Sequence, residues 1–109
     1  MSFLEDADKH LKKKEQIAEA DIEAKFVKYA TSHNCKAYKL RLLYGRGWPD
    51  RTVLCPGGKV LFIEFKRKNK ELRPTQKPVR LVLIKLGFKY YVCDEIGQAE
   101  KILEEELLL

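Results

Sequence analysis

The stretch KVLFIEF at 59–65 constrains the fold most strongly, because it is rich in β-forming residues and yet carries an acid within its apolar run. Side chains alternate between the two faces of a strand. Glu64 and Lys66 therefore share one face, while Ile63 and Phe65 point to the other. A carboxylate on a mostly apolar strand carries a desolvation cost, so Glu64 needs a partner.

The residues before this strand predict a β-hairpin that supplies a second carboxylate. RTVLC at 51–55 forms the first arm, PGG turns the chain, and Asp50 begins the arm. Neighbouring strands lie about 5 Å apart. Two carboxylates at that separation can share one Mg²⁺, which prefers one or two carboxylates together with water and phosphate oxygens. Lys66 can then polarise a water or stabilise negative charge on a phosphate.

Each of these residues also has an ordinary structural interpretation. Asp50 after a proline is a common turn residue, and Glu64 and Lys66 suit the exposed polar face of an edge strand. Their combination with a basic neighbourhood favours a functional site. The basic residues that cluster around these segments, and that we expect to contact phosphates, are Arg41, Arg46, Arg67, Lys68, Lys70 and Arg73.

The rest of the chain predicts a mixed sheet flanked by helices, in the order α-β-β-β-α-β-α. The expected elements are a helix with the apolar face Leu11, Ile17, Ile22, Phe26 and Ala30, a strand in 36–45, the hairpin, a helix after Thr75 that stops at Gly87, a strand at 88–93, and a final helix capped by Asp94.

Charge and cysteine content narrow the class of protein. The 109 residues carry a net charge of +6, which favours polyanionic partners, with nucleic acid first. The three cysteines are scattered singly, so we expect small buried residues and neither a disulfide framework nor a zinc site. No apolar run is long enough to span a membrane, and a soluble cytoplasmic protein of a bacterial host or phage-infected cell is expected.

The motif WPD, followed by IEFK, resembles the PD-(D/E)xK nuclease signature, with Asp50, Glu64 and Lys66 at its acidic and lysine positions. The surroundings GRGWPD and PGGKVLFIEFK resemble the virus-type replication-repair nuclease (VRR-Nuc) family, and the likeness covers residues 19 to about 103. Gln76 after RPT matches the family's glutamine. In EADIEAKFVKYA, Glu19 matches an acidic residue of the family's first helix, although Glu23 lies one turn away and can face the metal instead.

The resemblance implies a restriction-endonuclease-like core and a Mg²⁺- or Mn²⁺-dependent endonuclease. It implies a stand-alone, phage-type member that forms a homodimer and cuts branched DNA such as four-way junctions. Asp50, Glu64 and Glu19 would hold the metal, with Lys66 and Gln76 in the catalytic set. The nuclease domain would span 19–109, after a helical arm at 1–18. A non-catalytic basic DNA-binding module and a restriction-type nuclease remain the alternatives.

Two further features allow a functional interpretation. Tyr44 and Trp48 flank the glycine turn, where they can stack on an unpaired base or cap the core. A dimer can use the leucine tail at 107–109, or the apolar residues Phe3, Leu4 and Leu11 of the N-terminal arm.

Overall fold

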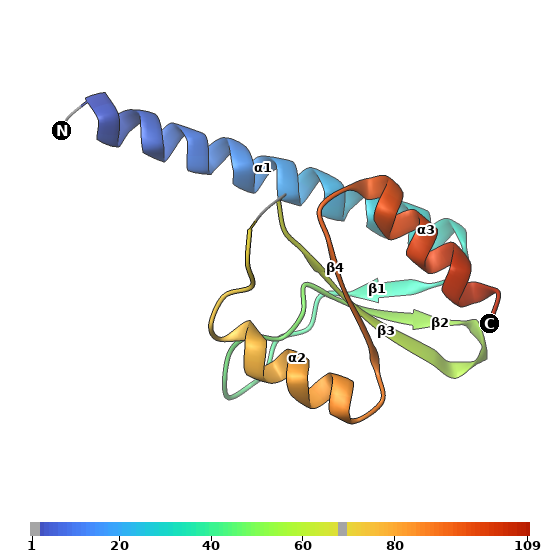
Figure 1. Cartoon of the computed structure of the whole chain (residues 1–109). Helices are drawn as coiled ribbons and strands as arrows, with labels where there is room; N and C mark the ends of the chain where they lie inside the picture. The colour runs from blue at the N-terminus through green and yellow to red at the C-terminus, as the bar shows by residue number, and fades with distance from the viewer. Residues whose placement is uncertain (1–2, 68–69) are drawn as a thin grey trace.

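The structure, a computed structural model, describes residues 3–67 and 70–109, with side chains in the first helix given for residue 9 and from residue 18 onward. It contains a four-stranded sheet with helices on both faces (Figure 1). The elements are α1 (Phe3–Ser32), β1 (Lys36–Tyr38), β2 (Arg51–Cys55), a single 3-10 turn η1 (Pro56–Gly58), β3 (Lys59–Phe65), α2 (Gln76–Lys85), β4 (Lys89–Cys93) and α3 (Ile96–Leu107). The predicted order and the restriction-endonuclease-like α/β class are confirmed.

The sheet has the strand order β1-β2-β3-β4, with β3 inside it. β2 runs antiparallel to both β1 and β3, and the register places Arg51 opposite Ile63. β4 runs parallel to β3, with Glu64 beside Val92. A parallel pair needs a crossover connection, and α2 provides it.

The alternation of β3 divides the core into two layers. One layer contains Leu61, Ile63 and Phe65 and packs beneath α1 and α3, where Phe26 and Leu103 are fully buried. The rings of Phe26 and Phe65 lie 5.6 Å apart. The other layer is smaller and lies under α2; its buried residues are Phe62, Leu83 and Tyr90. The prediction that Ile63 and Phe65 point away from Glu64 and Lys66 is confirmed.

Two local predictions were wrong. The strand expected in 36–45 ends at Tyr38, and residues 39–50 form an irregular loop in which Gly45 and Gly47 have φ values of +111° and +96°. The cap of α3 is Glu95 rather than Asp94. The Asp94 backbone N–H donates to Gln98 Oε1 at 3.1 Å, so the glutamine side chain reaches back to the start of the helix.

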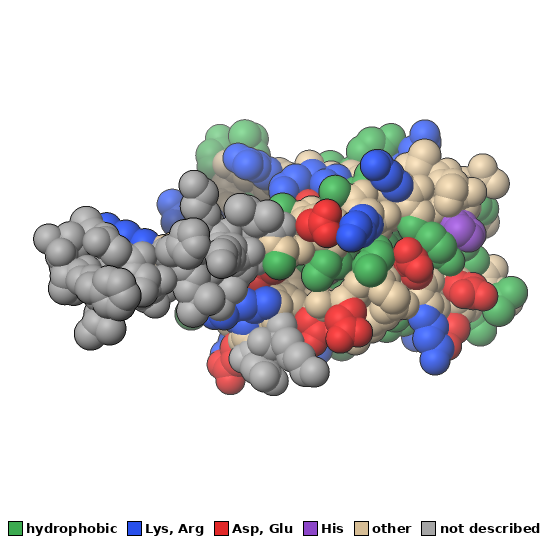
Figure 2. Space-filling view, turned by 90° about the horizontal axis from the view of Figure 1, so that it is seen from above, with side chains coloured by type: hydrophobic (Ala, Val, Ile, Leu, Met, Phe, Trp, Pro, Cys, Tyr) green, Lys and Arg blue, Asp and Glu red, His purple; other side chains and the backbone are tan. Residues whose placement is uncertain are grey.

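α1 is continuous from Phe3, and its N-terminal end extends beyond the sheet (Figure 1). The division of the chain at residue 18 stays a prediction, and Phe3, Leu4 and Leu11 lie outside the described side chains. Figure 2 looks onto the face of α1 and α3 and shows acidic and basic side chains interspersed there.

The three cysteines are buried and free, as expected. Within the described residues, none of the helices has the length and apolar character needed to cross a membrane.

Candidate active site

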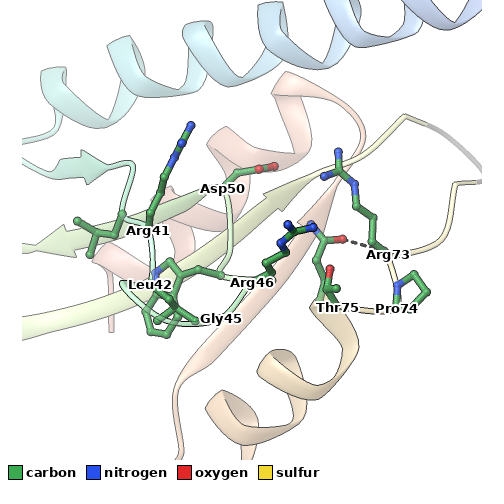
Figure 3. A pocket seen from close by; sticks show the side chains of 12 residues that line it. Arg41, Leu42, Gly45, Arg46, Asp50, Arg73, Pro74 and Thr75 are labelled. Atoms are coloured by element: carbon green, nitrogen blue, oxygen red, sulfur yellow. Dashed lines mark hydrogen bonds between the residues drawn. The ribbon is translucent and has the colours of Figure 1, made fainter.

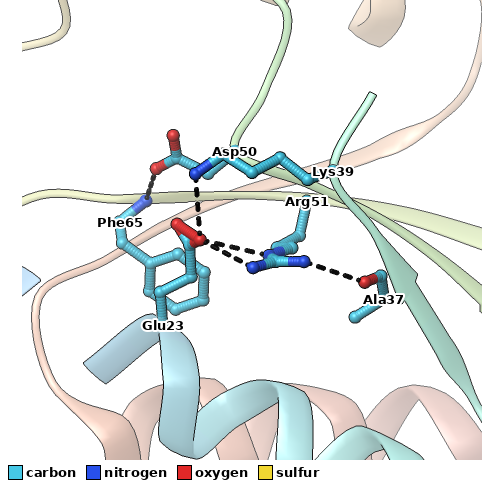
Figure 4. Close-up of polar contacts among 6 residues, drawn as sticks. All are labelled: Glu23, Ala37, Lys39, Asp50, Arg51 and Phe65. Atoms are coloured by element: carbon cyan, nitrogen blue, oxygen red, sulfur yellow. Dashed lines mark hydrogen bonds and ion pairs between the residues drawn. The ribbon is translucent and has the colours of Figure 1, made fainter. Parts of the chain in front are cut away.

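Asp50 lies beside Glu64 because of the register of the hairpin. Asp50 immediately precedes β2, one position beyond the Arg51–Ile63 pair, and is therefore opposite Glu64. Its carboxylate oxygen Oδ2 accepts a hydrogen bond from the Phe65 backbone N–H at 2.8 Å (Figure 4). The side chain thus extends the pairing of β2 and β3 by one contact and is held at the end of the two strands.

Glu64 is a buried carboxylate whose hydrogen bonding is incomplete. It is 1% exposed, and its Oε2 receives one long hydrogen bond of 3.4 Å from the Tyr90 hydroxyl. Among the described residues, Oε1 has no hydrogen-bond partner. Burial and, next, the neighbouring Asp50 raise the pKa of Glu64 to about 9, against the lowering effects of Lys66 and Gln76. The positive charge and the donors around Glu64 therefore do not offset its burial and the nearby Asp50.

Lys66 lies on the same face as Glu64 and is also buried, at 5% exposure. Its backbone N–H donates to the Cys93 carbonyl at 2.9 Å, which continues the pairing of β3 with β4 past the end of the strand. The ammonium group acts on the Glu64 carboxylate, whose pKa it lowers. The two buried side chains therefore lie close enough to interact electrostatically.

Gln76 begins α2 and is buried against the same site. Its Oε1 accepts the Arg73 backbone N–H at 2.8 Å, and the Gln76 side chain lowers the pKa of Glu64. The loop comes very close to this helix start: a Cβ added to Gly47 would lie 1.9 Å from the Thr75 carbonyl oxygen. Only a glycine fits there, and the contact joins the loop before Asp50 to the start of α2.

Glu19 and Glu23 have different surroundings, although they lie on the same face of α1. Glu23 pairs with Arg51 at 2.9 Å and with Lys39 at 3.4 Å, so its charge is already balanced (Figure 4). Glu19 Oε1 accepts the backbone N–H of Arg67 at 2.9 Å, directly after Lys66. Of the two, Glu19 is the acid next to the motif strand.

The oxygen donors of the site decide whether it can hold a cation. In the part of the chain that is described, no three His, Cys, Asp or Glu side chains gather closely enough to hold a metal. Glu19 therefore does not complete a three-carboxylate cluster. The Asp50–Glu64 pair and the unpartnered Glu64 Oε1 nevertheless suit a divalent ion such as Mg²⁺, which takes its other ligands from water and phosphate.

A cavity of about 790 Å³ opens beside Asp50. Three of the predicted basic residues, Arg41, Arg46 and Arg73, line it together with Gln76 (Figure 3). Arg67 is half-buried and Lys70 is exposed in the segment after β3, while Lys68 lies outside the described residues. The loop, the start of α2 and Asp50 thus surround a space with positive side chains on its walls.

Three residues in and around this region were not anticipated from the sequence. Tyr90 reaches Glu64 from β4, and Arg80 of α2 lies over the Tyr90 ring at 5.6 Å. The alternation in KYYVC places Tyr90 and Val92 on one face of β4. No local sequence pattern predicts that β4 pairs in parallel with β3, which brings Tyr90 to Glu64. Arg51, which neutralises Glu23, was also missed, although its alternation away from Asp50 indicates the opposite face of the sheet.

Comparison with known proteins agrees with this architecture. No family model matches the sequence. A solved structure described as "VRR_NUC domain" superposes with a TM-score of 0.75 at 24% identity, over 80% of this chain and 95% of that chain. The protein "Putative nuclease p44" of Acyrthosiphon pisum secondary endosymbiont phage 1 is 35% identical over 78 residues, which are 72% of this chain and 84% of the phage protein.

The fold is therefore that of a VRR-Nuc domain, a restriction-endonuclease-like α/β core with paired acids at the end of a hairpin. Given the similarity to the phage protein as well, the chain belongs to the VRR-Nuc family of nucleases.

The carboxylate pair leads to a prediction about metal binding without DNA. Mn²⁺ at a hundred times its Kd should raise the free energy of unfolding by about 2.7 kcal/mol. Asp50→Asn and Glu64→Gln should each lose this increment, because each removes one anionic ligand. Urea unfolding with Mn²⁺ or with EDTA measures the effect.

Glu23→Gln is the matched control, since it removes an acid that is already paired with Arg51. It should lower the stability of the protein but keep the Mn²⁺ increment. Glu19→Gln should reduce the increment if Glu19 is a third ligand, and an unchanged value would remove Glu19 from the metal site. An undiminished increment in Asp50→Asn and Glu64→Gln would contradict the site itself.

Proposed function

We propose that the chain is a metal-dependent endonuclease that hydrolyses phosphodiester bonds in DNA, preferentially branched DNA such as four-way junctions. The observation that carries the proposal is the Asp50–Glu64 pair, in which Glu64 is buried, with Lys66 on the same face and an arginine-lined cavity beside it. Family membership supports the nuclease activity, and the net charge of +6 supports a polyanionic substrate. Its place of action would be the cytoplasm of a bacterial host or phage-infected cell.

Hydrolysis needs an activated water and compensation of charge on the scissile phosphate. A Mg²⁺ or Mn²⁺ held by Asp50 and Glu64 would supply Lewis acidity and lower the pKa of bound water. Lys66, whose backbone N–H is held by the Cys93 carbonyl at the end of β3, would stabilise with its ammonium group the negative charge that develops on the phosphate. Gln76, whose Oε1 is held by the Arg73 backbone, would orient the water or a phosphate oxygen through its side-chain nitrogen.

Metal-dependent cleavage should distinguish this proposal from a DNA-binding module without activity. In Mg²⁺ or Mn²⁺, the protein should cut a labelled four-way junction faster than a linear duplex of the same sequence. In EDTA it should cut neither substrate. Asp50→Asn and Glu64→Gln should abolish cleavage and keep the binding of the junction, because they remove negative charge next to phosphate. Gel analysis of cleavage and of binding measures both. Activity in EDTA, or full activity of both variants, would rule out the site.

The arginines of the cavity should determine how binding depends on salt. Phosphate contacts release counterions, so the logarithm of the affinity should fall steeply with the logarithm of the salt concentration. Arg46→Ala and Arg73→Ala should each reduce that slope by about one unit. Lys85→Ala, at the other end of α2, is the matched control and should leave the slope unchanged. A slope that is flat for the parent protein would contradict the proposed surface.

A dimer would suit a junction, because two strands must be cut and the chain offers one catalytic constellation. Two-fold association supplies two copies in related positions, and closed two-fold dimers are the commonest homo-oligomers. The leucine tail supports one candidate interface, since Leu108 and Leu109 are 83% and 87% exposed.

Light scattering at micromolar concentration should give the mass of two chains. A chain truncated after Glu106 should become monomeric if the tail forms the interface. A truncated chain that remains dimeric would exclude the tail and indicate the N-terminal arm or another helical surface. A monomeric parent protein that still makes paired cuts would contradict the dimer.

A further inference from the structure

The loop between β1 and Asp50 carries two large apolar side chains at its tip. Leu43 and Tyr44 are 87% and 88% exposed, and they are consecutive in the chain. A single exposed apolar residue is ordinary on a protein surface, but two adjacent ones of this size expose a continuous apolar patch. The sequence left open whether Tyr44 caps the core, and its exposure excludes that role.

The base of the same loop is held in place. Trp48 donates through Nε1 to Thr52 Oγ1 at 3.0 Å and packs edge-on against the Phe62 ring at 5.5 Å. Gly47 lies against the backbone of Thr75 at the start of α2. Of the two aromatic residues, Trp48 therefore caps the core and Tyr44 does not. The tip of the loop extends from this fixed base.

The tip stands next to the cavity of the candidate site. Leu42 and Gly45, the residues on either side of Leu43 and Tyr44, line that cavity. In the close-up of Figure 3, Arg41 and Arg46 of the loop lie near Asp50. An apolar tip between two arginines, at the edge of a site that would hold a phosphodiester, has the composition of a surface that binds phosphates and stacks bases.

We infer that Leu43 and Tyr44 form a wedge that contacts unstacked bases beside the bond held at Asp50 and Glu64, and that this contact selects branched DNA. The inference rests on the proposed nuclease function. In continuous duplex the bases are stacked and paired, and inserting an apolar side chain costs their unstacking. At a branch point some bases are already unstacked, so the wedge can stack on them without that cost. Binding, and with it cleavage, is therefore favoured there.

Tyr44→Ala is the direct test, because stacking on one base is worth about 1–3 kcal/mol, or roughly five- to 150-fold. We expect junction cleavage to fall by about tenfold or more, and linear-duplex cleavage to change little. Tyr44→Trp should restore junction cleavage. Leu86→Ala, which removes another exposed leucine just past the end of α2, is the matched control and should cut the junction like the parent protein.

A binding measurement separates the wedge from the chemistry. In the Glu64→Gln protein, a junction labelled with 2-aminopurine at the branch point should change its fluorescence on binding. The change should disappear when Tyr44→Ala is added and persist with Tyr44→Trp. If the parent protein cuts no DNA, the proposed function fails, and this signal still decides whether the loop contacts bases.

Four results would overturn the inference. The first is junction cleavage by Tyr44→Ala within twofold of the parent protein. The second is an equal loss on junction and linear duplex, which would make Tyr44 a general binding residue. The third is conversion of a dimer to a monomer by Tyr44→Ala in light scattering, which would assign the patch to a contact between two copies of the chain. The fourth is a 2-aminopurine fluorescence change on binding that persists when Tyr44→Ala is added to the Glu64→Gln protein, which would contradict base contact by Tyr44.

Discussion

The hydrogen bond from the Phe65 backbone N–H to Asp50 Oδ2 is the contact on which the candidate site depends. It satisfies a backbone donor at the end of the β2–β3 ladder with a side chain rather than a carbonyl. The same bond holds Asp50 opposite Glu64, whose Oε1 is buried without a partner among the described residues. Two acids in this position weaken the fold in the absence of a cation, because a buried carboxylate is costly. The arrangement is therefore explained by function better than by stability.

The core of this arrangement was predictable because its signals are local. The alternation in KVLFIEF placed Glu64 and Lys66 on one face, and the short turn at 56–58 brought Asp50 to the same pair of strands. The early end of β1 was not predictable from the alternation of Tyr38, Leu40 and Leu42. Packing decides where a strand ends, and these three side chains are all exposed in the structure.

Long-range contacts determine the features of the site that could not be predicted from the sequence. Glu19 and Glu23 lie one turn apart on α1, so helical spacing alone does not separate them. Arg51 makes the distinction by pairing with Glu23, and it does so from β2, far away in the chain. Tyr90 likewise reaches Glu64 only because β4 lies parallel to β3. Resemblance to a family can name positions such as Gln76, but tertiary contacts determine what each side chain faces.

Burial separates the residues of the site into two groups with different freedom to change. Glu64, Lys66 and Gln76 are nearly inaccessible, and their positions depend on strand pairing, on the Cys93 carbonyl and on the Arg73 backbone. Arg41, Leu43, Tyr44 and Arg46 lie on a loop whose contacts with the core are made at its base, by Gly47 and Trp48. Substitutions at the exposed loop tip should therefore leave the carboxylate pair undisturbed, and under the proposed function they would alter which DNA is bound. Under the proposed function, the chemistry would thus be tied to the sheet, whereas substrate choice would be left to the loop.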